Sequence, residues 1–416
     1  MTEQTSCAAP TEAELTSRIE KVQARMEAEG LSHFVFVDPD NILWLTNFAN
    51  FIHERPFVLV LNDKGQLHFV VPELEIPHIK VRCFPSVEPV PYFEFPAPEG
   101  KQWSDRFAAL FTGSEKVGIE PNCPRFVQDA LPVQAIPTEL VEEARHIKSD
   151  YEIARIRYAC NIASDRMRHL LKSAKPNKSM LSVHSRVGKL SSLKLLLDNP
   201  QTNLLATKIS GVVQPAAISH DPHNFTNILD LGMEKGGPHV SIVAGILNGY
   251  GCEVERTFFL GEVPEAARAP YAVMMQARAL AFEMCKPGTS MHDLDAAVNG
   301  FIRDAGYGDN LLHRTGHGIG VTGHEGPFLA EGYTHEIQPG MVFTIEPGIY
   351  IEGIGGFRHS DTVLVTEHGN ESLTPLPDSL EDMTFPIKGL SKLGLPSFQK
   401  PLLRLAARLS GIKLEG

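Results

Sequence analysis

Two histidines and a glutamate stand in glycine-rich and strand-like segments where they could bind a metal ion or transfer protons. His317 lies between two glycines, His324 follows in Gly-His-Glu, and Glu346 ends an apolar run before Pro-Gly. Glycines allow the backbone to approach a ligand closely. Histidine titrates near neutral pH, and both residue types ligate divalent metals. A lone histidine is more often a satisfied core residue, but the three together indicate a functional site.

A pair of acids, Glu253 and Glu255, lies in the apolar segment 250–260. A spacing of two on a strand puts both carboxylates on one face. The dipeptide Asn248-Gly249 before them is a strong hairpin signal, so segment 242–247 should pair back on this strand. The alternative is an exposed strand face, because acidic surface residues are common.

Two further groups could take part. Arg358, His359 and Asp361 follow a glycine loop and precede an apolar strand, and the alternative for them is a surface hairpin. His220 and His223 lie in a loop before the Glu253 hairpin, where a histidine could act as general base.

The elements that must position these groups alternate between helical and strand patterns. In the first part of the chain we expect a helix at 14–30, a turn at 38–41, and strands at 34–37, 57–61 and 67–71. Beyond a charged helix at 142–163 we expect helices at 165–173, 264–284 and 291–305, and strands at 240–247, 250–260, 341–345 and 362–366. This pattern predicts an α+β or mixed fold.

We therefore expect three parts: a smaller α/β domain over 1–140, a catalytic domain over 141–384, and a basic amphipathic tail over 385–416. The tail could lie on a membrane surface or in a partner groove. Its alternative is a helix that packs on its own protein.

Composition restricts the possible partners and location. The chain has 416 residues and a formal net charge of -12, which disfavours nucleic-acid binding. Its six cysteines form no C-x-x-C pair, which favours reduced thiols and a cytoplasmic location. There is neither a signal-peptide pattern nor an apolar run of the roughly 20 residues that span a bilayer.

Four motifs resemble the pita-bread family that includes proline dipeptidase, aminopeptidase P and creatinase. They are Gly-His-Gly-Ile-Gly at 316–320, Gly-His-Glu-Gly-Pro at 323–327, Thr-Ile-Glu-Pro-Gly at 344–348 and Gly-Gly-Phe-Arg at 355–358. Segments 38–46 and 143–152 are similar to the family as well. The resemblance implies a pita-bread catalytic domain preceded by a creatinase-type N-terminal domain.

The family's peptidases hold two metal ions with five ligands, and only part of that set has a counterpart here. By resemblance, Val243 takes the place of the first aspartate, Glu253 replaces the second, His317 and Glu346 match, and Ser360 replaces the last glutamate. Valine and serine cannot bridge two cations. Glu253, His317 and Glu346 could then hold at most one divalent ion (Mn, Co, Fe or Zn).

Creatinase works without a metal, and this chain resembles it where it departs from the peptidases. The resemblance implies that His223 is the acid/base and that Glu255 and Glu346 bind the substrate. Arg55 falls where creatinase inserts an arginine into the neighbouring protomer's site, and His53 replaces an aromatic residue of the same stretch, which implies a homodimer. One departure is that the histidine expected at Ser360 stands one position earlier, at His359.

We therefore predict a creatinase-like hydrolase of a C–N bond in a small zwitterionic substrate derived from an amino acid, with no metal cofactor. One alternative is an Xaa-Pro dipeptidase or aminopeptidase with a single metal ion, and another is a non-catalytic binding module or a lyase on the same fold. The predicted catalytic residues are His223, Glu255, Glu346 and His324, and the predicted substrate-binding residues are Arg55, His53, His317 and Arg358.

Overall fold

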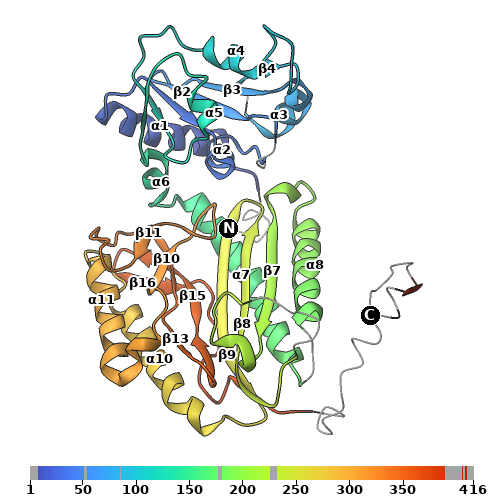
Figure 1. The fold of residues 1–416 in the computed structure, drawn as a ribbon, viewed down its shortest axis with the longest axis vertical. Coiled ribbons are helices and arrows are strands. Elements are labelled where there is room, and N and C mark those ends of the chain that lie inside the picture. The colour runs from blue at the N-terminus through green and yellow to red at the C-terminus, as the bar shows by residue number, and fades with distance from the viewer. Residues whose placement is uncertain are drawn as a thin grey trace. The chain divides into compact units, whose positions relative to one another are not determined.

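The structure of the chain is a computed structural model (Figure 1). It describes residues 8–50, 54–84, 86–176, 180–224, 232–388, 405 and 408–409. Contacts divide the chain into two units, one made of residues 1–146 with 203–206 and the other of 147–202 with 207–416. Most of the predicted tail and His53 lie outside the described residues.

The first unit is built around a six-stranded sheet with strand order β4-β3-β2-β1-β5-β6. Strands β1, β2 and β3 are antiparallel, and the outer pairs are parallel. The elements are α1 (Glu12–Ala28), β1 (His33–Phe36), α2 (Pro39–Thr46), β2 (Val58–Asn62), β3 (Leu67–Pro72), α3 (Ile76–Arg82), β4 (Val87–Tyr92), α4 (Trp103–Ala108), β5 (Val117–Ile119), α5 (Arg125–Gln128), β6 (Ala135–Pro137) and α6 (Leu140–Arg145).

The predicted elements of this unit are present, with one correction. Helix α1 buries Leu15, Ile19, Val22 and Met26, which recur at helical spacing. Segment 38–41 was predicted to be a turn, but it begins helix α2: the Asp38 carboxylate accepts hydrogen bonds from the backbone amides of Asp40 and Asn41. An Asp-Pro pair fits an N-cap as well as it fits a turn.

The second unit contains a nine-stranded sheet whose main order is β11-β10-β12-β15-β9-β8-β7. Strand β16 pairs with β15, and β17 pairs with β9. The elements are α7 (Asp150–Ser173), α8 (Met180–Asp198), β7 (Lys208–Gln214), α9 (Ala216–Ser219), β8 (Gly236–Leu247), β9 (Tyr250–Leu260), α10 (Glu265–Met284), α11 (Met291–Ile302), β10 (Gly316–Gly318), β11 (Glu325–Leu329), β12 (Val342–Ile345), β13 (Gly348–Ile351), β14 (Gly355–Arg358), β15 (Ser360–Thr366), β16 (Gly369–Ser372) and β17 (Thr384–Phe385).

The predicted helix at 142–163 is interrupted. Helix α6 ends at Arg145, and α7 starts afresh at Asp150 and continues to Ser173. Ser149 accepts a hydrogen bond from the amide of Glu152, and the Glu152 carboxylate accepts one from the amide of Ser149. This reciprocal cap defines a new helix start. The segments predicted at 142–163 and 165–173 thus belong mostly to one long helix, α7.

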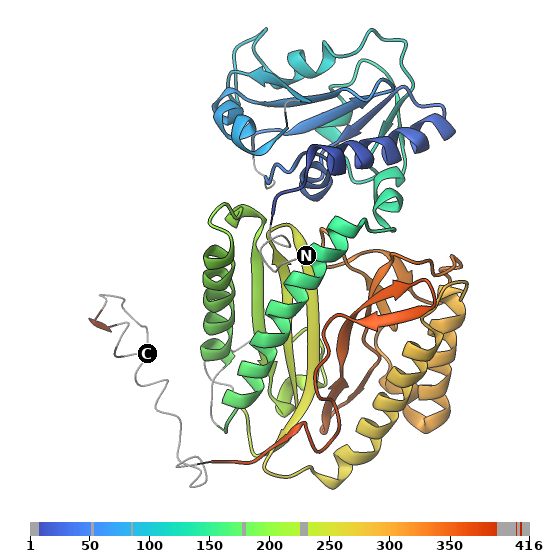
Figure 2. The same ribbon diagram turned by 180° about the vertical axis from the view of Figure 1, so that it is seen from behind.

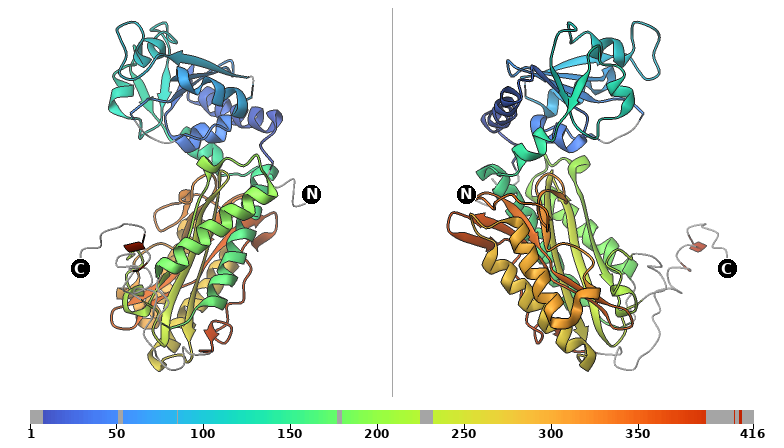
Figure 3. Two further views of the ribbon diagram at one scale, coloured as in Figure 1. Left: turned by 90° about the vertical axis from the view of Figure 1, so that its right-hand side faces the viewer. Right: turned by 60° about the vertical axis from the view of Figure 1, so that its left-hand side comes forward.

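Helices cover the sheet of the second unit. Helix α7 runs along strands β8 and β9 (Figure 2). Helices α10 and α11 lie side by side (Figure 3) and pack on β12 and β15 through a core that includes Met274, Leu294 and Phe343. None of the helices within the described residues is long and apolar enough to cross a membrane. The mixed helix and sheet content confirms the predicted α+β fold class.

Candidate active site

Strand β9 presents Glu253 and Glu255 on one face of the sheet, as predicted. The hairpin forms at the predicted turn, where Asn248 and Gly249 have φ values of 47° and 87°. Residues that pair directly across antiparallel strands share a face. Ala244 pairs with Glu253 and Ile242 with Glu255, so β8 offers only apolar side chains beside the two acids.

Val243 does not lie where the resemblance implied. It pairs with Val254, one residue out of phase with the two acids, and is fully buried. That face of the hairpin packs on α7, where the Ser241 hydroxyl lies 3.2 Å from Met167 Sδ. The positions that could supply a ligand from β8 are therefore Ile242 and Ala244, and neither has a ligating atom.

Ser360 joins the acid face from strand β15. It pairs with Glu255 in the sheet, and its hydroxyl donates a 2.7 Å hydrogen bond to Glu253 Oε1. Burial, followed by the charge of Glu346, raises the pKa of Glu253. Ser360 thus supplies a hydrogen-bond donor where a two-metal site needs a carboxylate.

Arg358 binds Glu255 directly. Arg358 Nη2 donates a 2.8 Å hydrogen bond to Glu255 Oε1, and Nε contacts the second carboxylate oxygen. Arg358 Nη1 donates to the Tyr350 hydroxyl at 3.0 Å. Burial raises the pKa of Glu255, and the charge of Arg358 counters that shift. Because both partners are almost fully buried, Arg358 acts as a fixed internal cation beside the three acids.

The hydrogen-bond chain continues to His313. The Tyr350 hydroxyl lies 2.7 Å from His313 Nε2, and His313 Nδ1 lies 2.8 Å from the carbonyl oxygen of Arg314. Since a carbonyl can only accept, Nδ1 carries the proton and Nε2 accepts from Tyr350. Burial lowers the pKa of His313, which favours this neutral form. The predictions did not include His313 or Tyr350.

His317 and Glu346 form the centre of the candidate site. His317 Nδ1 donates to the carbonyl oxygen of Gly318 at 2.9 Å, which directs Nε2 toward Glu346 Oε1 at 3.2 Å. Thr344 holds both residues: its hydroxyl oxygen accepts from the amide of His317 at 3.0 Å and lies 3.3 Å from Glu346 Oε1. Burial lowers the pKa of His317, but the hydrogen bond to Glu346 and the charges of Glu253 and Glu346 outweigh it and raise that pKa to about 9.

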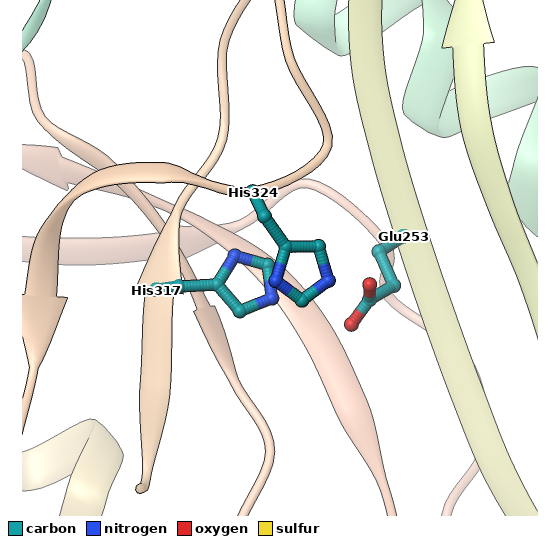
Figure 4. Close-up of side chains that lie close together, drawn as sticks. All are labelled: Glu253, His317 and His324. Carbon is teal, nitrogen blue, oxygen red and sulfur yellow. The ribbon is translucent and has the colours of Figure 1, made fainter. Parts of the chain in front are cut away.

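His324 stacks on His317. The two ring centroids are 3.8 Å apart with an interplanar angle of 19°. Figure 4 shows both rings and the Glu253 carboxylate directed toward one another. Desolvation, and then the charge of His317, lower the pKa of His324 to about 4. His324 is therefore neutral near pH 7 and can accept a proton or a metal ion.

A buried ion pair anchors the loop that carries His324. Glu325 accepts a hydrogen bond from the Thr322 hydroxyl at 3.1 Å and pairs with Lys148 Nζ at 3.1 Å. The Lys148 and Glu325 side chains are 1% and 2% exposed. Gly320 permits this arrangement, because a Cβ there would lie 2.2 Å from Glu325 Oε1.

His223 lies in a loop whose backbone is held by hydrogen bonds from the side chain of Gln214. The Gln214 amide donates to the carbonyl oxygens of Asp221 and Pro222, each at 3.0 Å. His223 is exposed and close enough for its charge to act on His313 and His324. The predicted residues His223, Glu255, Glu346, His324, His317 and Arg358 thus gather around one face of the second unit. Their catalytic roles stay predictions.

The remaining candidates lie elsewhere. His359 points to the other face of β15, where its ring packs on Tyr271 of α10 at 5.5 Å. It therefore cannot substitute for a histidine at Ser360. Arg55 lies in the first unit, where Glu94 and Glu54 accept its hydrogen bonds at 2.7 and 2.9 Å.

The donor set fits one divalent ion. Glu253, His317 and His324 offer ligand atoms that lie within 4.8 Å of one another, and so do Glu253, Glu255 and Glu346. His317 already donates from Nδ1 to a backbone carbonyl, which is the usual arrangement for a ligand that binds metal through Nε2. Glu255 is engaged by Arg358, and β8 supplies no oxygen ligand, so the second position of a two-metal site does not fit.

Comparisons with known proteins agree with this architecture. The family model described as "Metallopeptidase family M24" matches residues 154–367, and the model described as "Creatinase/Prolidase N-terminal domain" matches residues 18–159. The chain is 27% identical over 374 residues to the Xaa-Pro dipeptidase of Pyrococcus furiosus, which covers 86% of this chain and 98% of that protein. It is 31% identical over 278 residues to the uncharacterized peptidase YqhT of Bacillus subtilis, covering 64% and 75% of the two chains.

A solved structure of an Xaa-Pro dipeptidase is also similar to this chain. The Xaa-Pro dipeptidase from Bacillus anthracis superposes with a TM-score of 0.77 at 25% identity, covering 90% of this chain and all of that chain. These relatives are peptidases, so they support the peptidase alternative over the predicted creatinase-like activity, and they do not support the prediction of a metal-free site. The prediction of a hydrolase is confirmed, and the chain belongs to metallopeptidase family M24, with a creatinase/prolidase N-terminal domain before its catalytic domain.

Proposed function

We propose that this protein is a peptidase of the Xaa-Pro dipeptidase type that works with a single divalent ion. The observation that carries the proposal is the orientation of His317, whose Nδ1 is fixed by the Gly318 carbonyl and whose Nε2 is directed at Glu346. Glu253, His317 and Glu346 would hold the ion, and His324 is close enough to join them. When bound, such an ion would supply Lewis-acid polarisation of the peptide carbonyl and lower the pKa of water.

The chain's own side chains supply hydrogen-bonding and charged groups to the site. His324 is neutral near pH 7 and exposed beside His317, so its ring can accept a hydrogen bond from the attacking water or from the peptide. His223 is close enough for its charge to act on His324 and can hydrogen-bond the peptide. Arg358 holds the Glu255 carboxyl group in place, and its charge opposes the rise in the pKa of Glu255 that burial causes.

One ion, rather than two, follows from the sheet register. A dinuclear site needs carboxylates that bridge cations about 3.5 to 4 Å apart. Ala244 and Ile242 stand opposite the two acids of β9, and Ser360 donates a hydrogen bond to Glu253 where a two-metal site would need a bridging carboxylate.

The test is hydrolysis of Ala-Pro by protein freed of metal and then titrated with Mn²⁺, Co²⁺, Fe²⁺ or Zn²⁺. We expect activity to rise to a plateau at one equivalent of ion and to disappear in Glu346→Gln. Full activity in the presence of a strong chelator would refute the metal-dependent peptidase.

A second candidate is the creatinase-like hydrolysis of a C–N bond. One observation favours it: Glu253, Glu255 and Glu346 are all buried and lie within 4.8 Å of one another, which suits an amidinium group. Against it, Glu255 already binds the guanidinium of Arg358. Hydrolysis of creatine in the presence of chelator, lost in His223→Ala, would establish this function instead.

The resemblance also leads us to propose a homodimer and a cytoplasmic location. Sedimentation equilibrium of the full chain measures the first. A mass of one chain at micromolar concentration would contradict it.

A further inference from the structure

We infer that the buried ion pair between Arg256 and Asp361 positions the acidic side chains of the candidate site, a role whose effect on metal binding rests on the proposed function. Arg256 Nη2 lies 2.8 Å from Asp361 Oδ1, and both side chains are fully buried. Asp361 follows Ser360 on β15, so its side chain points to the opposite face of the sheet. The ion pair therefore lies behind the site and can act on it only through the strands.

Asp361 lies where the three strands that carry the acids meet. Its backbone pairs with Val254 of β9 on one side and with Ile345 of β12 on the other. Val254 directly follows Glu253, and Ile345 directly precedes Glu346. A movement of β15 at Asp361 would therefore change the separation of these two carboxylates, which have to converge on the proposed ion.

The pairing between β9 and β15 is short, and side chains complete it. It consists of two residue pairs, whereas β12 and β15 share four and β8 and β9 share ten. The hydroxyl of Thr362 donates to the carbonyl oxygen of Glu253 at 2.8 Å and accepts from the amide of Glu253 at 3.2 Å. The position of β9 relative to β15 thus depends on side-chain contacts as well as on the backbone.

Arg256 joins the two strands from behind. Its Nη1 donates to the carbonyl oxygens of Glu255 at 2.7 Å and of Ser360 at 3.0 Å, the two residues that pair with each other across the strands. Its Nη2 donates to Asp361 at 2.8 Å. Because a planar guanidinium presents several donors in a fixed arrangement, this one side chain holds a backbone carbonyl of each strand.

Asp361 is itself fixed by α10 and by the segment after β16. Arg278 Nε donates to Asp361 Oδ2 at 3.0 Å, and the hydroxyl of Thr374 donates to Oδ1 at 3.1 Å. Arg278 Nη1 also donates to Asp378 at 3.0 Å. The Asp361 carboxylate therefore connects the middle strand of the site to the helix layer that covers the sheet.

Replacing Arg256 by methionine separates positioning from charge. Loss of a cation would by itself strengthen the binding of a divalent ion, because less positive charge repels it, whereas loss of positioning should weaken binding. We expect the Kd for Mn²⁺, measured by calorimetric titration well below the melting temperature, to rise by about tenfold in Arg256→Met, as for other residues that orient metal ligands indirectly. Arg278→Met should give a smaller rise, since Arg256 still holds Asp361.

Ile302→Ala is the matched control for lost stability. It removes buried apolar atoms from α11, so it should lower Tm and leave the Kd for Mn²⁺ unchanged. A Kd that is unchanged or lower in Arg256→Met, or an equal rise in Ile302→Ala, would overturn the inference. If Arg256→Met does not fold, the Kd of Arg278→Met decides in the same way.

Hydrogen exchange of the metal-free protein is a second measurement, and it does not depend on the proposed function. In Arg256→Met or Arg278→Met, exchange should accelerate more in segments 251–256 and 359–364 than in α11, because the two strands separate locally. Equal acceleration in all of these segments would mean a loss of global stability only and would refute the positioning role. If the wild type binds no Mn²⁺, the proposed single-ion site fails, and hydrogen exchange alone decides about Arg256.

Discussion

Replacing Lys148 by methionine should destabilise the second unit strongly, because it leaves a buried carboxylate without its cation. Lys148 Nζ lies 3.1 Å from Glu325 Oε1, and both side chains are almost inaccessible to water. Methionine keeps most of the volume of the lysine stem, so packing is largely conserved. The variant therefore measures the effect of removing the lysine charge with little change in packing.

The magnitude follows from distance and burial. Two unit charges 3.1 Å apart attract by about 5 kcal/mol at an effective dielectric constant of 20. Removal of one partner from a buried pair costs about 3 to 5 kcal/mol in practice. For a unit of this size each kcal/mol lowers Tm by about 2 to 4 °C, so the melting temperature should fall by about 10 °C.

Differential scanning calorimetry of the full chain measures the effect, and a double-mutant cycle assigns its cause. Lys148→Met/Glu325→Gln should recover about 2 kcal/mol relative to the sum of the single variants, since no buried charge remains. Arg303→Gln is the matched control: its ion pair with Glu331 is 3.0 Å long but about half exposed, so its loss should cost less than about 1 kcal/mol. Two results would refute the reasoning: losses of stability in Lys148→Met and Glu325→Gln that simply add in the double variant, or a loss of stability in Arg303→Gln as large as that in Lys148→Met.

Three other changes test separate parts of the structure. Equilibrium dialysis with Mn²⁺ should give one ion per chain and none at comparable affinity in His317→Ala; two ions of similar affinity would contradict the single-ion site. Burial lowers the pKa of His239 to about 4 from 6.5. Between these two values the unfolded chain binds a proton at His239 and the folded chain does not, so the free energy of unfolding should fall by about 3 kcal/mol between pH 6.5 and pH 4. The melting temperature of His239→Gln should depend less on pH over that range than the melting temperature of the wild type. An unchanged pH dependence in the variant would argue against His239 as the cause. Gly356→Ala should lower both Tm and kcat, because its Cβ would lie 2.1 Å from the Ser219 carbonyl oxygen and displace α9, which leads into the His223 loop. Gly300→Ala, a helix position with open space around it, should instead raise stability by about 0.5 to 1 kcal/mol, and equal effects at the two sites would be inconsistent with the steric argument.

The β8–β9 hairpin could be predicted from sequence because its signals are local. Asn248-Gly249 specifies a tight turn, and the spacing of Glu253 and Glu255 places both acids on one face whatever the rest of the sheet does. The glycine-flanked His317 and the glutamate before Pro347 were informative for the same reason: each motif constrains its own backbone.

Pairing across strands was harder to predict. Val243 was assigned to the acid face from a resemblance, but a strand shifted by one residue presents the opposite side chains. The turn at Asn248-Gly249 sets that shift, and it puts Ala244 opposite Glu253. The break between α6 and α7 was missed although its capping signal, Ser149 followed by Glu152, stands in the sequence.

Residues that act through long-range contacts left no local signal. His313 and Tyr350 are 37 residues apart in the sequence, and the Tyr350 hydroxyl joins His313 to Arg358 only in the folded chain. Lys148 stands near the start of the second unit, and Glu325 follows far along the sequence, in strand β11. Nothing in the spacing of either pair indicates a contact, so the internal cation at Arg358 and the anchor of the His324 loop could be found only from the folded chain.

The register of this hairpin has a practical meaning for protein engineering. Val243→Asp would bury a carboxylate against α7 and create no ligand, whereas Ala244→Asp together with Ser360→Glu would add oxygens on the side of Glu253. Inserting one residue into β8 would have a larger effect: it would turn Val243 outward and send Ile242 and Ala244 toward the helix. The length of this strand therefore decides which of its side chains face the two acids, and a ligand at position 243 would need both the inserted residue and Val243→Asp.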